Sequence, residues 1–372
     1  MQRAPARSCG PGLGPRAAAA AATVVMLACA PGGQAPGKPV ATHKAEAGAK
    51  VKASAEAGVA VELVSCVDLP QTDARSHNLS GLAWDPVARQ LFAISDKDRW
   101  LTVLEPRPGF AGFDLGPSIE LDIDVDPWDG EAVALVEDGF LVVANETTPN
   151  LVWVDRRGRG ARALAVPGLR GIRDNLGIEG LGYAASAEGR FVFAVNEQAL
   201  EGDGPLSTIE HGTRVRILRH SLDGRADFAA VYLTDPIFAD SARGDNGVSD
   251  LAPLSPDRML VLERAYVSGR GNAARIYEVD LRGAQNIAGL GDVTTAVPVR
   301  KRLIVDVATL PDDRCSTPPM PQRRRTLENY EGLALGPSLP DGRRAVFLVS
   351  DDNERPSQIP RLLTLAIAPS SL

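Results

Sequence analysis

The fold is decided by Leu327-Glu328-Asn329-Tyr330-Glu331-Gly332-Leu333-Ala334-Leu335 and, beyond a turn, by Phe347-Leu348-Val349-Ser350-Asp351-Asp352-Asn353. An acidic residue and a glycine open the first apolar run, and acidic residues close the second. Short runs rich in β-branched and aromatic residues, bounded by turn residues, are typical of β-strands. We therefore expect an antiparallel strand pair whose polar ends lie together.

The same two-strand pattern occurs five times along the chain. A supersecondary unit repeated along a sequence indicates a propeller or a solenoid, because each unit buries its apolar face against the next. The four earlier copies are Ser80-Gly81-Leu82-Ala83-Trp84 with Phe92-Ala93-Ile94-Ser95-Asp96, Gly130-Glu131-Ala132-Val133-Ala134 with Val142-Val143-Ala144-Asn145-Glu146, Ile178-Glu179-Gly180-Leu181-Gly182 with Phe193-Ala194-Val195-Asn196-Glu197, and Val248-Ser249-Asp250-Leu251-Ala252 with Leu260-Val261-Leu262-Glu263-Arg264.

Each of the first four units continues with two more β-rich runs, and the run predicted as the fourth strand of unit one is 119–123. The fifth unit has only three runs, and the orphan run 61–67 at the start of the domain would supply its fourth strand. Four-stranded units closed by a strand from the other terminus describe a β-propeller, in which few sheet edges stay exposed. We predict an all-β fold, a β-propeller closed by an N-terminal strand.

Counting the units gives five blades. Six blades is the main alternative, because the long links 197–214 and 308–327 could hold short strands. A β-sandwich is the other all-β possibility, and five copies of one motif argue against it.

The N-terminal part of the chain is predicted to stay outside this domain. Residues 1–29 combine a positively charged start with an apolar run that is too short to span a bilayer, as in an export signal. The signal ends Val25-Met26-Leu27-Ala28-Cys29, which resembles a bacterial lipobox although Leu27 is larger than the residue preferred there. We expect an exported periplasmic or cell-envelope lipoprotein anchored at Cys29, with ordinary signal cleavage as the alternative. Residues 30–58 lack large apolar side chains and are predicted to be a disordered spacer, leaving the propeller at 59–372.

Charge and cysteine content restrict the possible partners. The net charge is −7, and residues 1–58 hold seven Lys or Arg and two Glu, so that residues 59–372 carry −7 − 5 = −12. An acidic domain argues against nucleic-acid binding and favours cations. Cys66 and Cys315 are the only cysteines of the domain. In an exported protein they are expected to form a disulfide, with two free thiols as the alternative. We expect a monomer.

The repeated polar groups predict a site at one mouth of the propeller channel, because strand one starts and strand two ends there. Ser80, Glu131, Glu179, Asp250 and Glu331 would form one ring. So many carboxylates cannot all ionise unless basic groups or cations compensate them. Oxygen ligands from loops suit Ca²⁺, so we predict a calcium site whose ligands are Glu131, Glu179, Glu197, Asp250, Glu263, Glu331, Asp351 and Asp352. A wider second ring would hold Asp96, Glu146, Glu197, Glu263, Asp351, Asp352 and Asn353.

Two alternatives apply to the polar residues. Repeated acids at blade ends also serve as caps that bind backbone amides of the next blade. Among the histidines, His77 just before the first ring is the better candidate base, and His211 in a long loop is the weaker one.

The ordered set of these motifs resembles the phytase-like family, which is also called the "esterase-like activity of phytase" family. The resemblance extends roughly over residues 79–367 and implies an exported bacterial propeller that hydrolyses phosphate esters with calcium as cofactor. Unit two departs from the pattern, with Glu131-Ala132 in place of acid-Gly, and the Lys and Arg residues expected to hold several phosphates are sparse. The matching positions are Glu179, Asp250, Glu263, Glu331 and Asp351.

Three functions remain open from the sequence. The first is calcium-dependent hydrolysis of a small-molecule phosphate ester or other ester, with Glu179 or Glu331 as general base. Arg264, Arg173 or Lys97 would neutralise the phosphate oxygens. The second is a non-catalytic, envelope-tethered propeller that binds a ligand or partner. The third is a lactonase-type calcium enzyme with His77 or His211 as base.

Overall fold

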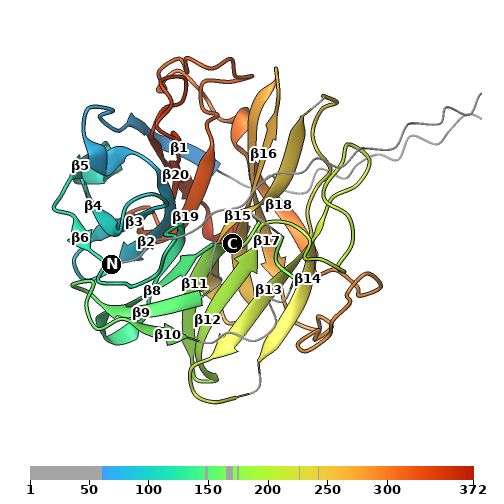
Figure 1. Ribbon diagram of the computed structural model, residues 1–372. Coiled ribbons are helices and arrows are strands. Elements are labelled where there is room, and N and C mark those ends of the chain that lie inside the picture. Colours follow the sequence, from blue (N-terminus) through green and yellow to red (C-terminus); the bar gives the residue numbers. More distant parts are fainter. Residues whose placement is uncertain (1–60, 147–149, 165–170, 174–175, 226, 242) are drawn as a thin grey trace, which may run out of the picture. The chain divides into compact units, whose positions relative to one another are not determined.

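The described residues of the computed structural model form a ring of five antiparallel sheets (Figure 1). The export signal and the spacer predicted for residues 1–58 lie outside the described part of the chain. That part is 61–146, 150–164, 171–173, 176–225, 227–241 and 243–372.

Each sheet is one blade, and its strands follow one another from the channel outward. Blade one contains β2 (Leu79–Asp85), β3 (Gln90–Ser95), β4 (Trp100–Pro106) and β5 (Phe113–Leu115), with β6 (Ile119–Glu120) also paired to β4. Blade two contains β7 (Gly130–Leu135), β8 (Phe140–Asn145), β9 (Asn150–Asp155) and β10 (Arg162–Leu164). Blade three contains β11 (Ile178–Ser186), β12 (Gly189–Asn196), β13 (Arg214–Ser221) and β14 (Phe228–Leu233).

The last two blades follow the same plan. Blade four contains β15 (Gly244–Ser255), β16 (Arg258–Val267), β17 (Gly271–Asp280) and β18 (Arg300–Asp306). Blade five contains β19 (Tyr330–Ser338), β20 (Arg344–Ser350), β21 (Arg361–Ile367) and, outermost, β1 (Val61–Asp68). Short 3₁₀ helices complete the description: η1 (Ala74–Ser76), η2 (Pro108–Phe110), η3 (Glu137–Gly139), η4 (Val307–Thr309) and η5 (Pro369–Ser371).

Closure by the N-terminal strand is confirmed. Strand β1 pairs antiparallel with β21, from Val61 opposite Ile367 to Asp68 opposite Arg361. A disulfide joins Cys66 of β1 to Cys315, as the sequence predicted. The two ends of the described domain are thus held in one sheet by hydrogen bonds and by a covalent link.

The five-blade count is also confirmed. The inner strands β2, β7, β11, β15 and β19 neighbour one another in chain order, and β19 neighbours β2, which closes the ring. The links 197–214 and 308–327 contain no strand, although both lie fully within the described residues, so the six-blade alternative is wrong.

One predicted strand of blade one was misplaced. The sequence predicted its fourth strand at 119–123, whereas two short strands, β5 and β6, both pair with β4. Gly116 and Pro117 separate them, and proline has no N–H to donate to a sheet. Leu121 and Ile123 beyond β6 are buried against blade two without forming a strand.

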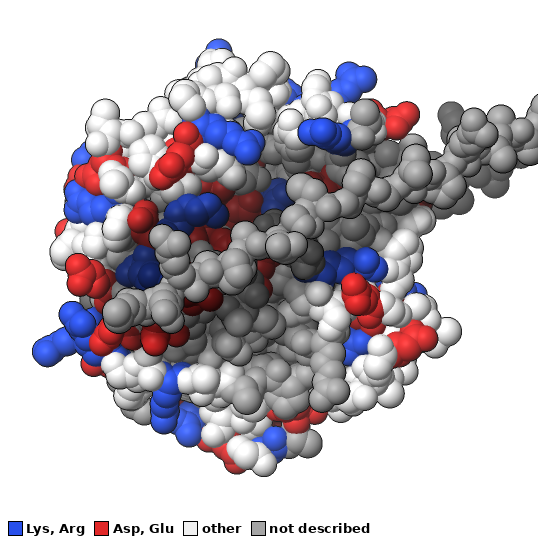
Figure 2. All heavy atoms as spheres, viewed as in Figure 1, with Lys and Arg blue, Asp and Glu red and all other residues white. Residues whose placement is uncertain are grey.

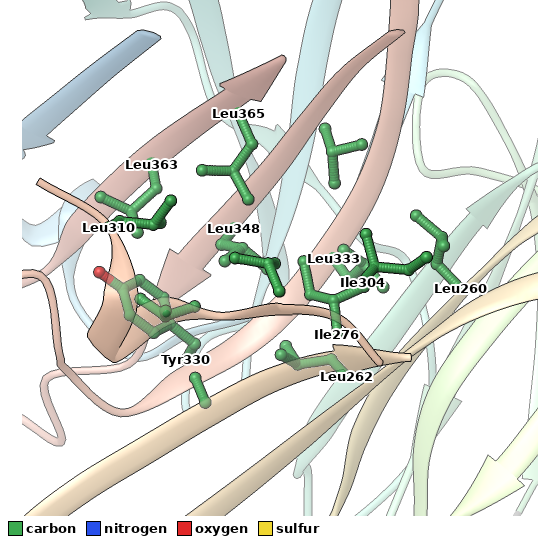
Figure 3. Packing of buried hydrophobic residues seen from close by; sticks show 14 of the residues in the cluster. Leu260, Leu262, Ile276, Ile304, Leu310, Tyr330, Leu333, Leu348, Leu363 and Leu365 are labelled. Carbon is green, nitrogen blue, oxygen red and sulfur yellow. The ribbon is translucent and has the colours of Figure 1, made fainter. Parts of the chain in front are cut away.

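Apolar side chains between neighbouring blades form the core, as Figure 3 shows for blades four and five. Leu260 and Leu262 of β16 pack with Leu333 of β19, and Leu348 and Leu365 of β20 and β21 complete the contact. The middle strands β20 and β21 are near-continuous apolar runs that are buried on both faces, because each blade packs against a neighbour on either side.

The glycines of the repeat let the inner strands meet closely. A Cβ atom on Gly332 would lie 2.3 Å from the carbonyl oxygen of Ser80, and one on Gly81 would lie 2.7 Å from the Cα of Ala132. On Gly180 it would lie 2.9 Å from the Cα of Asp250. The acid-Gly motif therefore encodes contact between successive inner strands as well as a polar end.

Candidate functional site

The first ring is built on a β-bulge that recurs in every inner strand. The pairing of each inner strand with its neighbour shifts register at the polar residue: at Glu131 in β7, Glu179 in β11 and Glu331 in β19. In β2 the shift includes Ser80. In β15 the extra residue is Ser249, so Ser249 and not Asp250 occupies the ring position of blade four.

Asp250 corresponds instead to the glycine of the repeat and points into the centre of the ring. Its oxygens accept hydrogen bonds from the amides of Leu251 and Leu333, both at 2.7 Å. Burial raises the pKa of Asp250, and hydrogen bonds from amides of four inner strands oppose that rise. Those amides belong to Leu333, Leu251, Leu181 and Leu82. The prediction that Asp250 belongs to the mouth ring was therefore wrong, because the bulge shifts it by one residue.

The second ring shows the same one-residue shift in blade four. Ser95, Asn145 and Asn196 stand opposite the first residue of their inner strands, and the acids Asp96, Glu146 and Glu197 follow them. Ser350 and Asp351 repeat this arrangement in blade five. In blade four Glu263 stands where the other blades have serine or asparagine. Arg264 follows it, at the position that an acid occupies in the other blades.

Glu263 is consequently a buried structural residue. It accepts hydrogen bonds from the Tyr232 hydroxyl at 2.5 Å, the Asp235 amide at 2.9 Å and the Lys301 ammonium at 2.6 Å. A carboxylate with so many donors needs no metal to compensate its charge. Its predicted place in the mouth ring was also wrong.

The remaining ring residues surround a cavity of about 570 Å³ at one mouth of the channel. Figure 2 shows acidic side chains gathered with Lys and Arg side chains in a hollow of one face. Acidic residues outnumber basic ones in the cavity wall. Its described acids are Asp96, Asp129, Glu131, Glu146, Glu179, Glu197, Asp245, Glu331 and Asp351, and its described cations are Lys97, Arg243, Arg264 and Arg355.

The crowding of carboxylates changes their protonation. Burial, with Glu131 and Glu197 nearby, raises the pKa of Glu179 well above its ordinary value. Burial also raises the pKa of the neighbouring Glu146, and the hydrogen bond that it accepts from the Gly177 amide at 2.8 Å opposes that rise. Burial raises the pKa of Glu197 to about 8, although Arg264 beside it lowers the value. Part of the cavity wall is therefore protonated near neutral pH.

Arg264 is the buried cation of this wall. Its Nη2 lies 3.3 Å from an oxygen of Glu197 and 3.3 Å from an oxygen of Glu331, and its Nη1 lies 3.7 Å from Asp245. Burial alone would lower the pKa of Arg264, but these carboxylates raise it. Burial also raises the pKa of Glu331, and Arg264 opposes that rise. Arg264 thus holds acids of three blades together.

Three carboxylates could hold a metal ion. One oxygen each of Asp96, Asp129 and Glu131 lie within 4.8 Å of one another. The Lys97 ammonium stands beside them, 2.6 Å from Asp96 and 3.4 Å from Asp129, and Ser80 donates a hydrogen bond to Glu131 at 2.7 Å. Carboxylate oxygens are hard ligands, and three of them would supply part of the set that a divalent cation needs.

Several predicted residues do not line the cavity. His77 is bonded at both ring nitrogens, to Asp352 at 2.6 Å and to the Gln71 carbonyl at 2.9 Å. Burial lowers the pKa of His77, but the hydrogen bond and the charge of Asp352 outweigh this effect, so that the pKa is raised overall. His77 is therefore protonated more readily and is poorly suited to act as a base. Asp352 is buried with it. Arg173 donates to the Ala199 carbonyl, and His211 is exposed.

Five of the metal ligands predicted from the sequence line the cavity: Glu131, Glu179, Glu197, Glu331 and Asp351. The sequence prediction missed Asp129 and Asp245. Asp129 precedes the inner strand directly, as Asn78 and Asn329 do in blades one and five, and this polar position was a usable signal. Asp245 lies where β15 extends beyond the other inner strands, which no local pattern indicated.

The family model described as "Phytase-like: Esterase-like activity of phytase" matches residues 75–354, well over half of the chain. This chain belongs to the phytase-like family. No curated protein matches its sequence.

Solved structures similar to this phytase-like domain share little sequence with it. A PQQ-bound aldose sugar dehydrogenase from Streptomyces coelicolor is 13% identical, with 84% of this chain and 99% of that chain covered and a TM-score of 0.42. A streptogramin B lyase is 9% identical, with coverage of 83% and 98% and a TM-score of 0.36. A nidogen/laminin complex chain is 11% identical, with coverage of 83% and 98% and a TM-score of 0.40. In the described part of the phytase-like chain, no helix has the length and apolar character needed to cross a membrane.

Proposed function

We propose that this phytase-like chain is a calcium-dependent hydrolase of phosphate esters that acts at the acidic cavity. The observation that supports the proposal is the convergence of Asp96, Asp129 and Glu131 beside Lys97 in one wall. This arrangement offers oxygen ligands for a metal and a cation for a phosphate group within one cavity. The esterase-like activity that names the family is consistent with it.

Different residues of the cavity wall would bind the metal and the phosphate group. Asp96, Asp129 and Glu131 would hold the metal. Bound Ca²⁺ supplies a Lewis acid for the phosphoryl oxygens and lowers the pKa of a water molecule. Lys97 and Arg264 line the same cavity and would neutralise the remaining phosphate charge.

Proton transfer would fall to two glutamates. Burial and the neighbouring carboxylates raise the pKa of Glu179 and favour its protonated form, so it could protonate a leaving oxygen. Glu331 is paired with Arg264, which favours its charged form and makes it the better general base. Both residues line the same cavity.

The test is a phosphomonoester assay with calcium buffered by a chelator, run beside a calcium titration of thermal unfolding. We expect turnover and a rise in melting temperature with calcium, and loss of both in Asp129→Asn. Asp114→Asn, an exposed acid of blade one outside the cavity, is the matched control and should keep both. Calcium-independent turnover would contradict the metal site.

A second function is favoured by the ion pairs of the cavity. Lys97 already contacts Asp96 and Asp129, and Arg264 already contacts Glu197 and Glu331. A wall compensated in this way suits a non-catalytic propeller that binds a cationic ligand or partner. Calcium stabilisation without turnover of phosphate or carboxylic esters would favour binding. Hydrolysis of a lactone in the same assay would favour the lactonase alternative.

We also propose that the chain is exported and anchored by lipid at Cys29. The Cys66–Cys315 disulfide supports export, because disulfides persist in oxidising compartments. Metabolic labelling with palmitate should mark the full chain and fail to mark Cys29→Ser. Equal labelling of both would exclude the anchor.

A further inference from the structure

A second cavity of about 610 Å³ lies at the opposite end of the inner strands. Strand β2 starts beside the acidic cavity at Ser80 and ends beside the second cavity at Trp84 and Asp85. Between them the buried Asp250 carboxylate gathers the inner-strand amides. The two cavities are therefore separate sites.

The wall of the second cavity is mostly apolar. Trp84, Leu135, Pro253 and Pro337 come from the ends of inner strands, and Pro86 and Val87 come from the turn that follows β2. Val87 is 83% exposed and adds apolar surface to the rim of this wall. Such a surface favours a ligand with an apolar body.

Arg344 supplies an uncompensated positive charge in this wall. It is the first residue of β20, and its Nε is fully buried without a hydrogen-bond acceptor among the described residues. Burial lowers the pKa of Arg344, and no carboxylate opposes the effect. Its chain neighbour Arg343 differs, because it pairs with Asp341 and Glu62.

The acids of the wall do not serve Arg344. Asp85 is paired with Arg156 and accepts amide hydrogen bonds from Val87 at 2.9 Å and Ala88 at 3.1 Å. Glu137 is exposed, and among the described residues it forms no ion pair with Arg344. A buried guanidinium donor without an acceptor is costly, and a ligand that supplies one regains that energy.

We propose that this second cavity binds an organic carboxylate with an apolar body, with Arg344 holding the carboxylate. The planar guanidinium matches a carboxylate in shape, and the tryptophan, leucine and proline side chains would cover the apolar body. An inorganic anion would gain nothing from these side chains. Without bound calcium, the excess of acids in the cavity at the other mouth disfavours an organic carboxylate there.

The experiment uses the whole chain with excess chelator, so that no calcium at the acidic cavity captures the probe. Titration calorimetry compares 1-naphthoate with neutral 1-naphthalenemethanol. We expect saturable binding of one 1-naphthoate and a loss of about tenfold or more in Arg344→Gln, the value typical of a charge-assisted hydrogen bond. Arg344→Lys keeps the charge without the planar fork and should fall between the two.

Arg343→Gln is the matched control, since it removes the same charge one residue away and outside the cavity. We expect it to bind 1-naphthoate within about twofold of the parent chain, well inside the change that one such hydrogen bond produces. The neutral probe should not distinguish the variants. Absence of saturable 1-naphthoate binding, an unchanged affinity in Arg344→Gln, or an equal loss in Arg343→Gln would each overturn the proposal.

Discussion

Blade four and the other blades carry the same residue types at their channel ends and use them differently. Blades two, three and five place glutamates at the bulge, and these line the cavity. Blade four places Ser249 there and moves its acid by one residue to Asp250, which binds backbone amides. Its second acid, Glu263, is likewise displaced by one residue, and Arg264 enters the cavity.

The comparison shows that a shift of one residue along a strand decides whether a carboxylate lines the cavity or binds backbone and side-chain donors in the interior. Successive side chains of a strand point to opposite faces, so a shift of one residue moves a side chain from one face of the strand to the other. Blade four thereby supplies the ring with its central amide acceptor and the cavity with its buried cation. The predictions below test this division, beginning with the largest expected effect.

Asp250→Ala should lower the free energy of unfolding by about 4 kcal/mol, because several buried amides would lose their acceptor at once. Chemical denaturation with chelator present measures the change. Asp245→Ala removes an acid that is 42% exposed at the cavity and should cost less than about 1 kcal/mol. Equal effects of the two variants would mean that Asp250 is not the structural centre of the ring.

Arg264→Gln should lower the free energy of unfolding by about 2–3 kcal/mol, because Glu197 and Glu331 would keep their burial and lose their partner. Adding Glu197→Gln should recover part of the loss, since it removes one of the two uncompensated acids. The double-mutant cycle is measured by chemical denaturation at pH 7. Additive effects would show that Arg264 does not compensate Glu197.

The acids of the cavity should make the folded state less stable as pH rises. The pKa of Glu197 is about 8 in the folded chain and near 4.5 when unfolded, so the folded state holds the extra proton between these values. Its contribution is therefore present at low pH and is lost as pH rises toward 8, by up to about 1.4 kcal/mol per pH unit. Unfolding with chelator at pH 5, 6.5 and 8 should give a shallower slope for Glu197→Gln. An unchanged slope would contradict the assignment.

Much of this architecture was accessible from the sequence, because strand runs and their turn residues repeat locally. The five blades, the closing strand and the disulfide follow from repeat counting and from a leftover run with a leftover cysteine. The sequence did not show that Asp250 is displaced by one residue in blade four. Ser249-Asp250 resembles the acidic motif of the other blades whether or not a bulge precedes the acid. Asp129 had a local signal in the polar residue that precedes the inner strand, whereas Asp245 reaches the cavity through an extension of β15 that no local pattern encodes.

The smallest effects distinguish Glu131 of blade two from Glu263 of blade four. Glu263→Gln keeps the shape but weakens the bond to Lys301, and should cost about 1 kcal/mol of unfolding free energy while leaving calcium stabilisation intact. Glu131→Gln should leave stability in chelator unchanged or slightly higher, because burial and the charge of Asp96 raise the pKa of Glu131 well above its ordinary value. It should nevertheless reduce the calcium-dependent rise in melting temperature, since Glu131 belongs to the acid triad. If Glu263→Gln instead abolished the calcium response, the displaced acid of blade four would be a ligand, and register would not separate the two roles.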